Sequence, residues 1–178
     1  MRRIAAARLH RGIDAPPLIA VWKAPSIACM ARALNGIDEN VLRRVLGEHS
    51  EVEVAYVYGS YARGRPNRHS DLDVGVFVAD RRLRRRLPAT YEVDLGLAVG
   101  AATHHTRVEV AVLNTASPLL GWEAVRRGRC VFERSSRMRI AHETRVRQRY
   151  LDTAPLRAIQ DRYLDELVRR GFSRAVSS

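Results

Sequence analysis

Two aspartates and a glycine–serine turn have the residue types and spacing best suited to chemistry in this chain. Gly59 and Ser60 are followed, after ten intervening residues, by Asp71 and Asp73. The flanking stretches, 52–58 and 72–78, are rich in β-branched and aromatic residues, which predicts a strand, a glycine turn, a short helix and a second strand. Side chains two apart on a strand share a face, so we expect both carboxylates to point the same way.

This arrangement indicates divalent metal ions next to a phosphate. Two carboxylates held close together are costly unless cations lie between them. Gly59 lets the backbone approach a ligand, and Ser60 can open a helix whose free N–H groups favour a phosphate. Oxygen ligands combined with phosphates are the usual surroundings of Mg²⁺. Two such ions would clamp the attacking and leaving oxygens in nucleotidyl transfer.

A third carboxylate is expected on a neighbouring strand, and residues 107–113 supply one. Val108, Val110 and Val112 alternate there and predict an apolar face, which leaves Glu109 on the opposite face. Glu109 is therefore the candidate third ligand. The alternative is a lone glutamate that faces water on a half-buried strand.

Each feature taken alone also has an ordinary structural explanation. A Gly-Ser turn is usually only a turn, and an Asp-x-Asp pair is usually a solvated strand end; the combination favours function. Arg63 is equally suited to contacting phosphate and to an ion pair with Asp71 or Asp73. His104 and His105 resemble a metal pair, but adjacent residues do not face each other, so a surface loop is predicted.

The spacing of Gly59, Ser60, Asp71 and Asp73 resembles the signature of the DNA polymerase beta-type nucleotidyltransferase superfamily. The fuller form, Gly-Ser-x-Ala-Arg-Gly and then Ser-Asp-x-Asp, is similar to its minimal nucleotidyltransferase branch. Three further stretches resemble the MntA-type adenylyltransferase antitoxins of type VII toxin–antitoxin systems: 113–120, 125–133 and 149–152. The resemblance covers roughly residues 37–165 and does not reach the first thirty.

The resemblance implies roles for the motif residues. Gly59 and Ser60 would hold the triphosphate of ATP, and Asp71 and Asp73 would coordinate two Mg²⁺ ions. Arg63, in the Ala-Arg-Gly of the motif, would face phosphate or brace the acids.

Glu109 and the acceptor complete the activity that the resemblance implies. The protein would be an antitoxin that transfers AMP from ATP to a tyrosine hydroxyl of a cognate HEPN-family RNase toxin and releases pyrophosphate. Glu109 would help to hold the ion that lowers the pKa of the acceptor hydroxyl. The family usually has Asp at this position, and the extra methylene of Glu109 bears on the rate rather than on the class of reaction.

Other functions stay open on the sequence. One is a nucleotidyltransferase acting on RNA ends, and another is an enzyme modifying a small molecule such as an antibiotic. The positive charge of the chain argues against the acidic pocket that a cationic drug needs. A binding-only antitoxin is the last alternative; the intact aspartates speak against it, and Glu109 is the one feature in its favour.

Composition bounds the class of protein. The chain has 178 residues, 46% of them hydrophobic, enough for one domain with a core, and no apolar run long enough to span a membrane. Two cysteines without metal spacing fit a reducing cytosol, so we expect a cytoplasmic protein. The formal charge of +12 comes almost entirely from arginine and favours an acidic partner or a polyanion such as RNA. An arginine bias of genomic origin is the alternative explanation.

We expect three segments along the chain. Residues 1–35 form an arginine-rich N-terminal extension that is poorly ordered; our hypothesis is that it is not native and that Met30 is the true start. Residues 36–135 form the nucleotidyltransferase core, and residues 136–178 form a C-terminal helical segment.

The predicted fold is α/β (α+β), the minimal nucleotidyltransferase fold: a mixed sheet with helices packed mainly on one side, followed by C-terminal helices. Asp38 and Ser117 are the predicted N-caps of two helices. A further helix is predicted over 89–100 from Val93 and Leu97, which lie one turn apart. Residues 130–132 are expected to form a short edge strand, and helices are expected over 136–151 and 155–170.

Overall fold

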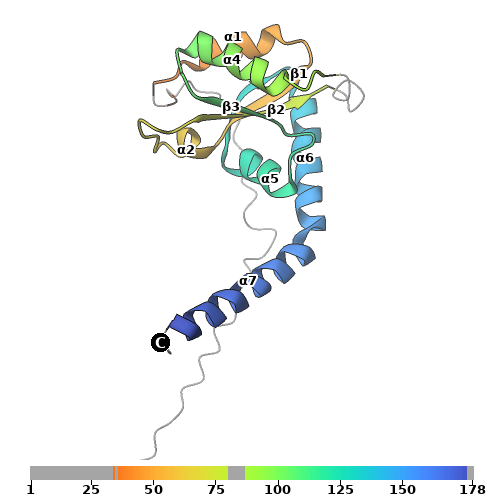
Figure 1. The fold of residues 1–178 in the computed structure, drawn as a ribbon. Coiled ribbons are helices and arrows are strands. Elements are labelled where there is room, and N and C mark those ends of the chain that lie inside the picture. Colours follow the sequence, from red (N-terminus) through yellow and green to blue (C-terminus); the bar gives the residue numbers. More distant parts are fainter. Residues whose placement is uncertain (1–33, 35, 80–86, 176–178) are drawn as a thin grey trace, which may run out of the picture.

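A mixed four-stranded sheet forms the centre of the molecule (Figure 1). The computed structural model describes residues 34, 36–79 and 87–175, and their side chains as far as residue 168. The strand order is β3-β2-β1-β4; β1 is antiparallel to both β2 and β4, and β2 is parallel to β3. The strands are β1 (Val52–Val57), β2 (Leu72–Val78), β3 (Val108–Val112) and β4 (Arg129–Glu133). The predicted mixed sheet, with 130–132 inside an edge strand, is confirmed.

Two helices begin where capping chemistry predicts. The Asp38 carboxylate accepts a hydrogen bond from the Asn40 N–H at 2.8 Å, and the Ser117 hydroxyl accepts one from the Leu120 N–H at 3.2 Å. Both side chains satisfy N–H groups that have no partner within the helix. The helices are α1 (Glu39–Glu48), α2 (Gly59–Ala62), α4 (Tyr91–Thr103), α5 (Pro118–Arg127), α6 (Ser136–Asp152) and α7 (Ala154–Ala175).

One face of the sheet packs against α1 and α4. Alternate residues of β2, from Leu72 to Val78, are completely buried there, together with Leu42 and Leu46 of α1. The α4 residues in this core are Tyr91, Leu95 and Val99.

Val93 and Leu97, the pair from which the α4 helix was predicted, face solvent, with 62% and 68% of their surface exposed. The helix exists, but its buried face was not the one these two residues indicated. Gly96 and Gly100 lie on the packed side, where an added Cβ would approach the Val108 and His105 carbonyl oxygens to 3.4 and 2.8 Å. Apolar residues lie on both sides of α4, with Leu95 and Val99 buried and Val93 and Leu97 exposed, so periodicity alone does not select the buried face.

The opposite face of the sheet is covered by α5 and α6. Val54, Tyr56, Phe77 and Leu113 form a second core there with Ala124, Val125 and Val146. Helices therefore lie on both faces, which corrects the expectation that they pack mainly on one side. The reason is that every residue of β1 is buried, so both of its faces need a cover.

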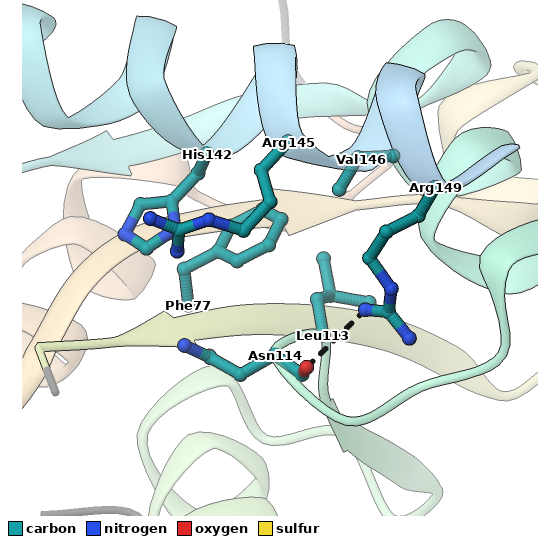
Figure 2. Close-up of a pocket in the computed structure, with 7 residues that line it drawn as sticks. All are labelled: Phe77, Leu113, Asn114, His142, Arg145, Val146 and Arg149. Atoms are coloured by element: carbon teal, nitrogen blue, oxygen red, sulfur yellow. Dashed lines mark hydrogen bonds between the residues drawn. The ribbon is translucent and has the colours of Figure 1, made fainter. Parts of the chain in front are cut away.

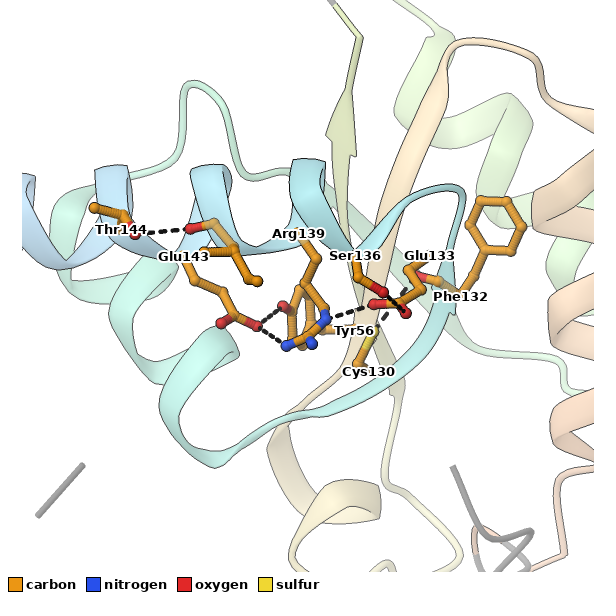
Figure 3. A network of polar contacts seen from close by, with 9 residues as sticks. Tyr56, Cys130, Phe132, Glu133, Ser136, Arg139, Glu143 and Thr144 are labelled. Carbon is orange, nitrogen blue, oxygen red and sulfur yellow. Dashed lines mark hydrogen bonds and ion pairs between the residues drawn. The ribbon is translucent and has the colours of Figure 1, made fainter. Parts of the chain in front are cut away.

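Polar contacts fasten α6 to the sheet (Figure 3). The buried Tyr56 hydroxyl donates to the Glu143 carboxylate at 2.6 Å, and Arg139 donates to Glu143 at 2.9 Å and to Glu133 at 2.5 Å. Burial and the bond to Glu143 raise the pKa of Tyr56, so the phenol stays protonated and acts as the donor. This network accounts for the position of α6 in the middle of the second face.

Helix α7 continues from α6 after Thr153 and runs away from the sheet (Figure 1). Within the described ranges, no helix has both the length and the apolar character needed to cross a membrane. Most of the predicted N-terminal extension, residues 1–33 together with 35, lies outside the described residues.

Candidate functional site

The candidate site lies on the second face of the sheet, at the end where β1 finishes and β2 and β3 begin. Asp73 and Glu109 are direct neighbours in the parallel β2–β3 ladder. Adjacent strands lie about 4.8 Å apart, so these two carboxylates share a face and an edge. Asp71 immediately precedes β2 and is exposed, whereas Asp73 is half-buried. Strand register therefore brings Asp73 and Glu109 together, and Asp71 lies two residues before Asp73.

Gly59 lies directly against Asp73. Its φ is +66°, and an added Cβ would overlap the Asp73 carboxylate. A backbone hydrogen bond joins the two segments at the same place, because the Tyr58 N–H donates to the Asp73 carbonyl at 3.0 Å. The glycine is thus required both by conformation and by the carboxylate that occupies the space beside it.

Ser60 and Arg63 follow Gly59 in a tight turn of helix. The Arg63 N–H donates to the Gly59 carbonyl at 3.3 Å, and the Arg65 N–H donates to the Ser60 carbonyl at 3.1 Å. Ser60 is partly exposed at the start of α2, and the Arg63 side chain is exposed. The charge of Arg63 reaches Asp73, and Ser60 directly follows the glycine that lies against that carboxylate.

The electrostatics of Asp73 reflect this crowding. Burial raises its pKa above the ordinary value, and the negative charges of Glu109 and Asp71 raise it further, while Arg63 lowers it. A bound cation would reduce this repulsion between neighbouring carboxylates, as is typical of a metal site.

Two arginines, Arg63 and Arg107, partly neutralise the negative charges of Asp73 and Asp71. Arg63 acts on Asp73 through its charge, whereas the ion pair of Asp71 is with Arg107, at 3.9 Å. Arg107 also donates to the His69 carbonyl at 3.3 Å, and its own carbonyl accepts from the Leu72 N–H at 2.9 Å. Arg107 thereby ties the loop that carries Asp71 to the start of β3.

A family model described as "Polymerase beta, Nucleotidyltransferase" matches residues 40–137, more than half of the chain. The chain belongs to the polymerase beta nucleotidyltransferase family. All of the candidate site residues fall within this nucleotidyltransferase domain. Comparison with curated proteins found no significant match.

Solved structures of antitoxin complexes share the fold of this nucleotidyltransferase. A mutant form of the toxin–antitoxin MntA-HpeT is 22% identical, with a TM-score of 0.62 over 72% of this chain and 99% of the other. A toxin–antitoxin with AMP-PNP is 23% identical, with a TM-score of 0.61 over 71% and 98%. A structure of the tri-AMPylated Shewanella oneidensis HEPN toxin in complex with MNT antitoxin is 21% identical, with a TM-score of 0.56 over 71% of this chain and 95% of the other. At these identities the likeness establishes the minimal nucleotidyltransferase fold.

The carboxylates of the candidate site fit a Mg²⁺ ion whose remaining ligands come from a bound nucleotide. In the described part of the chain, no group of three or more His, Cys, Asp or Glu side chains is arranged to hold a metal ion by itself. Mg²⁺ rarely needs such a cage, because one or two carboxylates and the substrate phosphates usually provide its ligands. The crowded oxygens of Asp71, Asp73 and Glu109 are of the type this ion prefers.

Tyr58, the last residue of the stretch 52–58 that predicted a strand, lies beside the carboxylates. Burial, Asp73 and Glu109 raise the pKa of Tyr58 to about 12, so its hydroxyl stays protonated beside the carboxylates. Its position directly after β1 and directly before Gly59 of the motif is the signal that could have identified it.

His105 proves to be more than a surface loop residue. Its Nε2 lies 3.4 Å from the Tyr61 hydroxyl, and the two rings meet edge to face at 5.3 Å. His105 therefore supports α2 from outside the motif. His104, as predicted, is in a turn, where it ends α4 with a φ of +55°.

A separate pocket lies at the other end of β2, beneath α6 (Figure 2). Arg149 crosses its rim and donates to the Asn114 carbonyl at 3.2 Å, and His142 stacks on Phe77 at 4.5 Å. Asp73 and Phe77 stand at opposite ends of β2, so this pocket is not part of the carboxylate site. Its lining residues are Phe77, Leu113, Asn114, His142, Arg145, Val146 and Arg149.

Proposed function

We propose that this protein is an antitoxin that transfers AMP from ATP to a tyrosine hydroxyl of a cognate HEPN-family RNase toxin and thereby neutralises it. The pairing of Asp73 with Glu109 across the β2–β3 ladder, next to a glycine whose added Cβ would overlap the Asp73 carboxylate, is the observation that carries the proposal. The fold shared with structures of toxin–antitoxin pairs, one of which holds a tri-AMPylated HEPN toxin, supports this choice of partner.

In the proposed reaction, the tyrosine oxygen of the toxin attacks the α-phosphorus of ATP. The bond from that phosphorus to the bridging oxygen breaks, pyrophosphate leaves, and the hydroxyl proton passes to solvent. Asp71, Asp73 and Glu109 would hold Mg²⁺, which when bound neutralises phosphate charge and lowers the pKa of the acceptor hydroxyl.

The residues of the chain contribute positioning and charge. Gly59 and Ser60 would hold the phosphates that leave, since they open α2, where the first N–H groups have no partner within the helix. Arg63 would balance their charge from the exposed side of α2. Arg107 would keep Asp71 in place before the nucleotide arrives. Fixed donors and charges of this kind lower the barrier because they need no rearrangement during the reaction.

The test is transfer of label from α-³²P-ATP in the presence of Mg²⁺ to the protein encoded by the neighbouring gene. We expect label on that protein, and a loss on the order of a hundredfold or more in the Asp73→Asn variant. Asp94→Asn is the matched control, because Asp94 is exposed on α4 and its carboxylate accepts from the Thr90 hydroxyl at the start of the same helix.

Different acceptors give different outcomes. Label on RNA instead of protein would move the assignment to RNA-end transfer. A tight complex that silences the toxin without any label would establish a binding-only antitoxin. Full activity in Asp73→Asn would refute the site itself.

A further inference from the structure

Helix α7 carries an apolar stripe that no part of the described chain covers. Its six large apolar side chains between residues 156 and 168 are 45–62% exposed: Leu156, Ile159, Tyr163, Leu164, Leu167 and Val168. Spacings of three and four residues place them on one side of the helix. Contiguous exposed apolar surface of this kind marks an interaction site.

The stripe is presented on a helix whose start is held in place. Arg157 donates to the Tyr150 carbonyl at 2.8 Å and bonds the Thr153 hydroxyl, and its guanidinium lies 3.7 Å from the centre of the Tyr150 ring. Tyr150 in turn stacks on Trp122 of α5 at 4.8 Å. The start of α7 is therefore joined to the end of α6, which itself packs on α5, as expected for a docking element rather than a loose tail.

We propose that the α7 stripe docks the protein partner of this nucleotidyltransferase, a protein of net negative charge that offers an apolar helix face or groove. The inference rests on the proposed function, since it names the surface by which the acceptor protein is held. The chain has a formal charge of +12, so a second copy is repelled, whereas an acidic protein is attracted.

The polar residues of α7 argue against a nucleic acid as the occupant. The five arginines of Ala154–Ala175 are interleaved with Asp161, Asp165 and Glu166, so the helix has a net charge of only +2 and its acids would repel phosphates beside the stripe. Large aliphatic side chains recognise apolar protein surface, and amphipathic helices commonly lie in such grooves.

The experiment compares the affinity of the full chain and of two variants for the protein encoded by the neighbouring gene, by calorimetry. Tyr163→Asp places a charge within the stripe. Ala158→Asp places the same charge on the opposite, exposed face of the same helix and serves as the control. We expect Tyr163→Asp to weaken binding at least tenfold and Ala158→Asp to change it less than twofold. Both sites are exposed, so neither variant is expected to unfold.

Sedimentation of the chain alone and label transfer separate the possible failures. Equal binding by both variants overturns the docking surface but leaves the proposed function intact. A dimer of the chain alone that Tyr163→Asp dissociates replaces the acidic partner with a second copy. No binding and no label in the unaltered chain overturns the proposed function as well.

Discussion

Gly59 and Asp73 form a pair in which each residue constrains the other. The positive φ of Gly59 brings its Cα against the carboxylate, and the backbone bond from Tyr58 to the Asp73 carbonyl locks that approach. A glycine here has two separable roles, backbone conformation and space. The two roles can be measured separately, because Gly36 has the positive φ but no neighbour in the space of an added Cβ.

Gly59→Ala is expected to abolish AMP transfer, because its methyl group must displace the Asp73 carboxylate. Gly36 is the matched control: its φ is +98°, but nothing lies within 4 Å of an added Cβ. Gly36→Ala should cost about 1 kcal/mol of stability from backbone strain and leave transfer unchanged. The measurement is label transfer together with thermal unfolding. An active Gly59→Ala enzyme would show that Asp73 is free to move.

At the scale of elements, α1 is joined to β4 by a charged pair under the first face of the sheet. Glu39 is almost fully buried, and the Arg129 Nη2 lies 2.5 Å from its carboxylate. Burial raises the pKa of Glu39, although Arg129 and Arg43 act in the opposite direction. Desolvation therefore outweighs the attraction of the pair, as is common for buried ions.

This balance predicts how stability depends on pH. An acid whose pKa is raised in the folded state stabilises most below its unfolded pKa of 4.5, and loses that contribution as pH rises through its folded pKa. Glu39→Gln should therefore melt at the same temperature as the unaltered chain, or higher, at pH 7. The difference should shrink as pH falls toward 4.5.

Glu123→Gln provides the control for this pH series, because Glu123 pairs with Arg127 on the surface at 3.3 Å. Such pairs contribute about 0–1 kcal/mol, so its melting temperature should hardly change. Thermal unfolding between pH 4 and 8 measures both variants. A Glu39→Gln protein that melts well below the unaltered chain at pH 7 would mean that the Arg129 pair dominates over desolvation.

At the scale of the whole molecule, the two C-terminal helices differ in kind. Helix α6 belongs to the fold, because His142, Glu143 and Val146 are buried against the sheet and His142 lies 2.6 Å from Glu53. Helix α7 is described with its side chains almost wholly exposed. One helix contributes to stability and the other to association.

A chain that ends at Asp152 should therefore unfold cooperatively within about 2 °C of the full chain, since little packing is lost. It should retain nucleotide binding and lose affinity for its protein partner. A chain that ends at Glu133 is the contrasting control and should not unfold cooperatively, because it lacks the buried residues of α6. A large drop in melting temperature for the first truncation would place α7 within the folded core.

Local chemistry made the strands, the caps and the motif predictable from sequence. Val and Leu alternate in 72–78 and 108–112, which set the strands and put the acids on one face. Asp38 and Ser117 set two helix starts, since capping needs only neighbouring N–H groups. The motif spacing identified the superfamily that the matching family model confirms. The roles of Gly59, Ser60, Arg63, Asp71, Asp73 and Glu109 stay predictions.

The tertiary structure alone decided which surfaces meet. The face of α4 was misjudged, because apolar residues lie on both sides of this helix and only packing shows which side is buried. Arg107 and His105 joined the site through contacts between segments far apart in the chain. In the sequence, the apolar stripe of α7 has the same pattern as the buried face of a helix that packs on a core. Periodicity records that a face is apolar, and only the packing shows that nothing in the described chain lies against it.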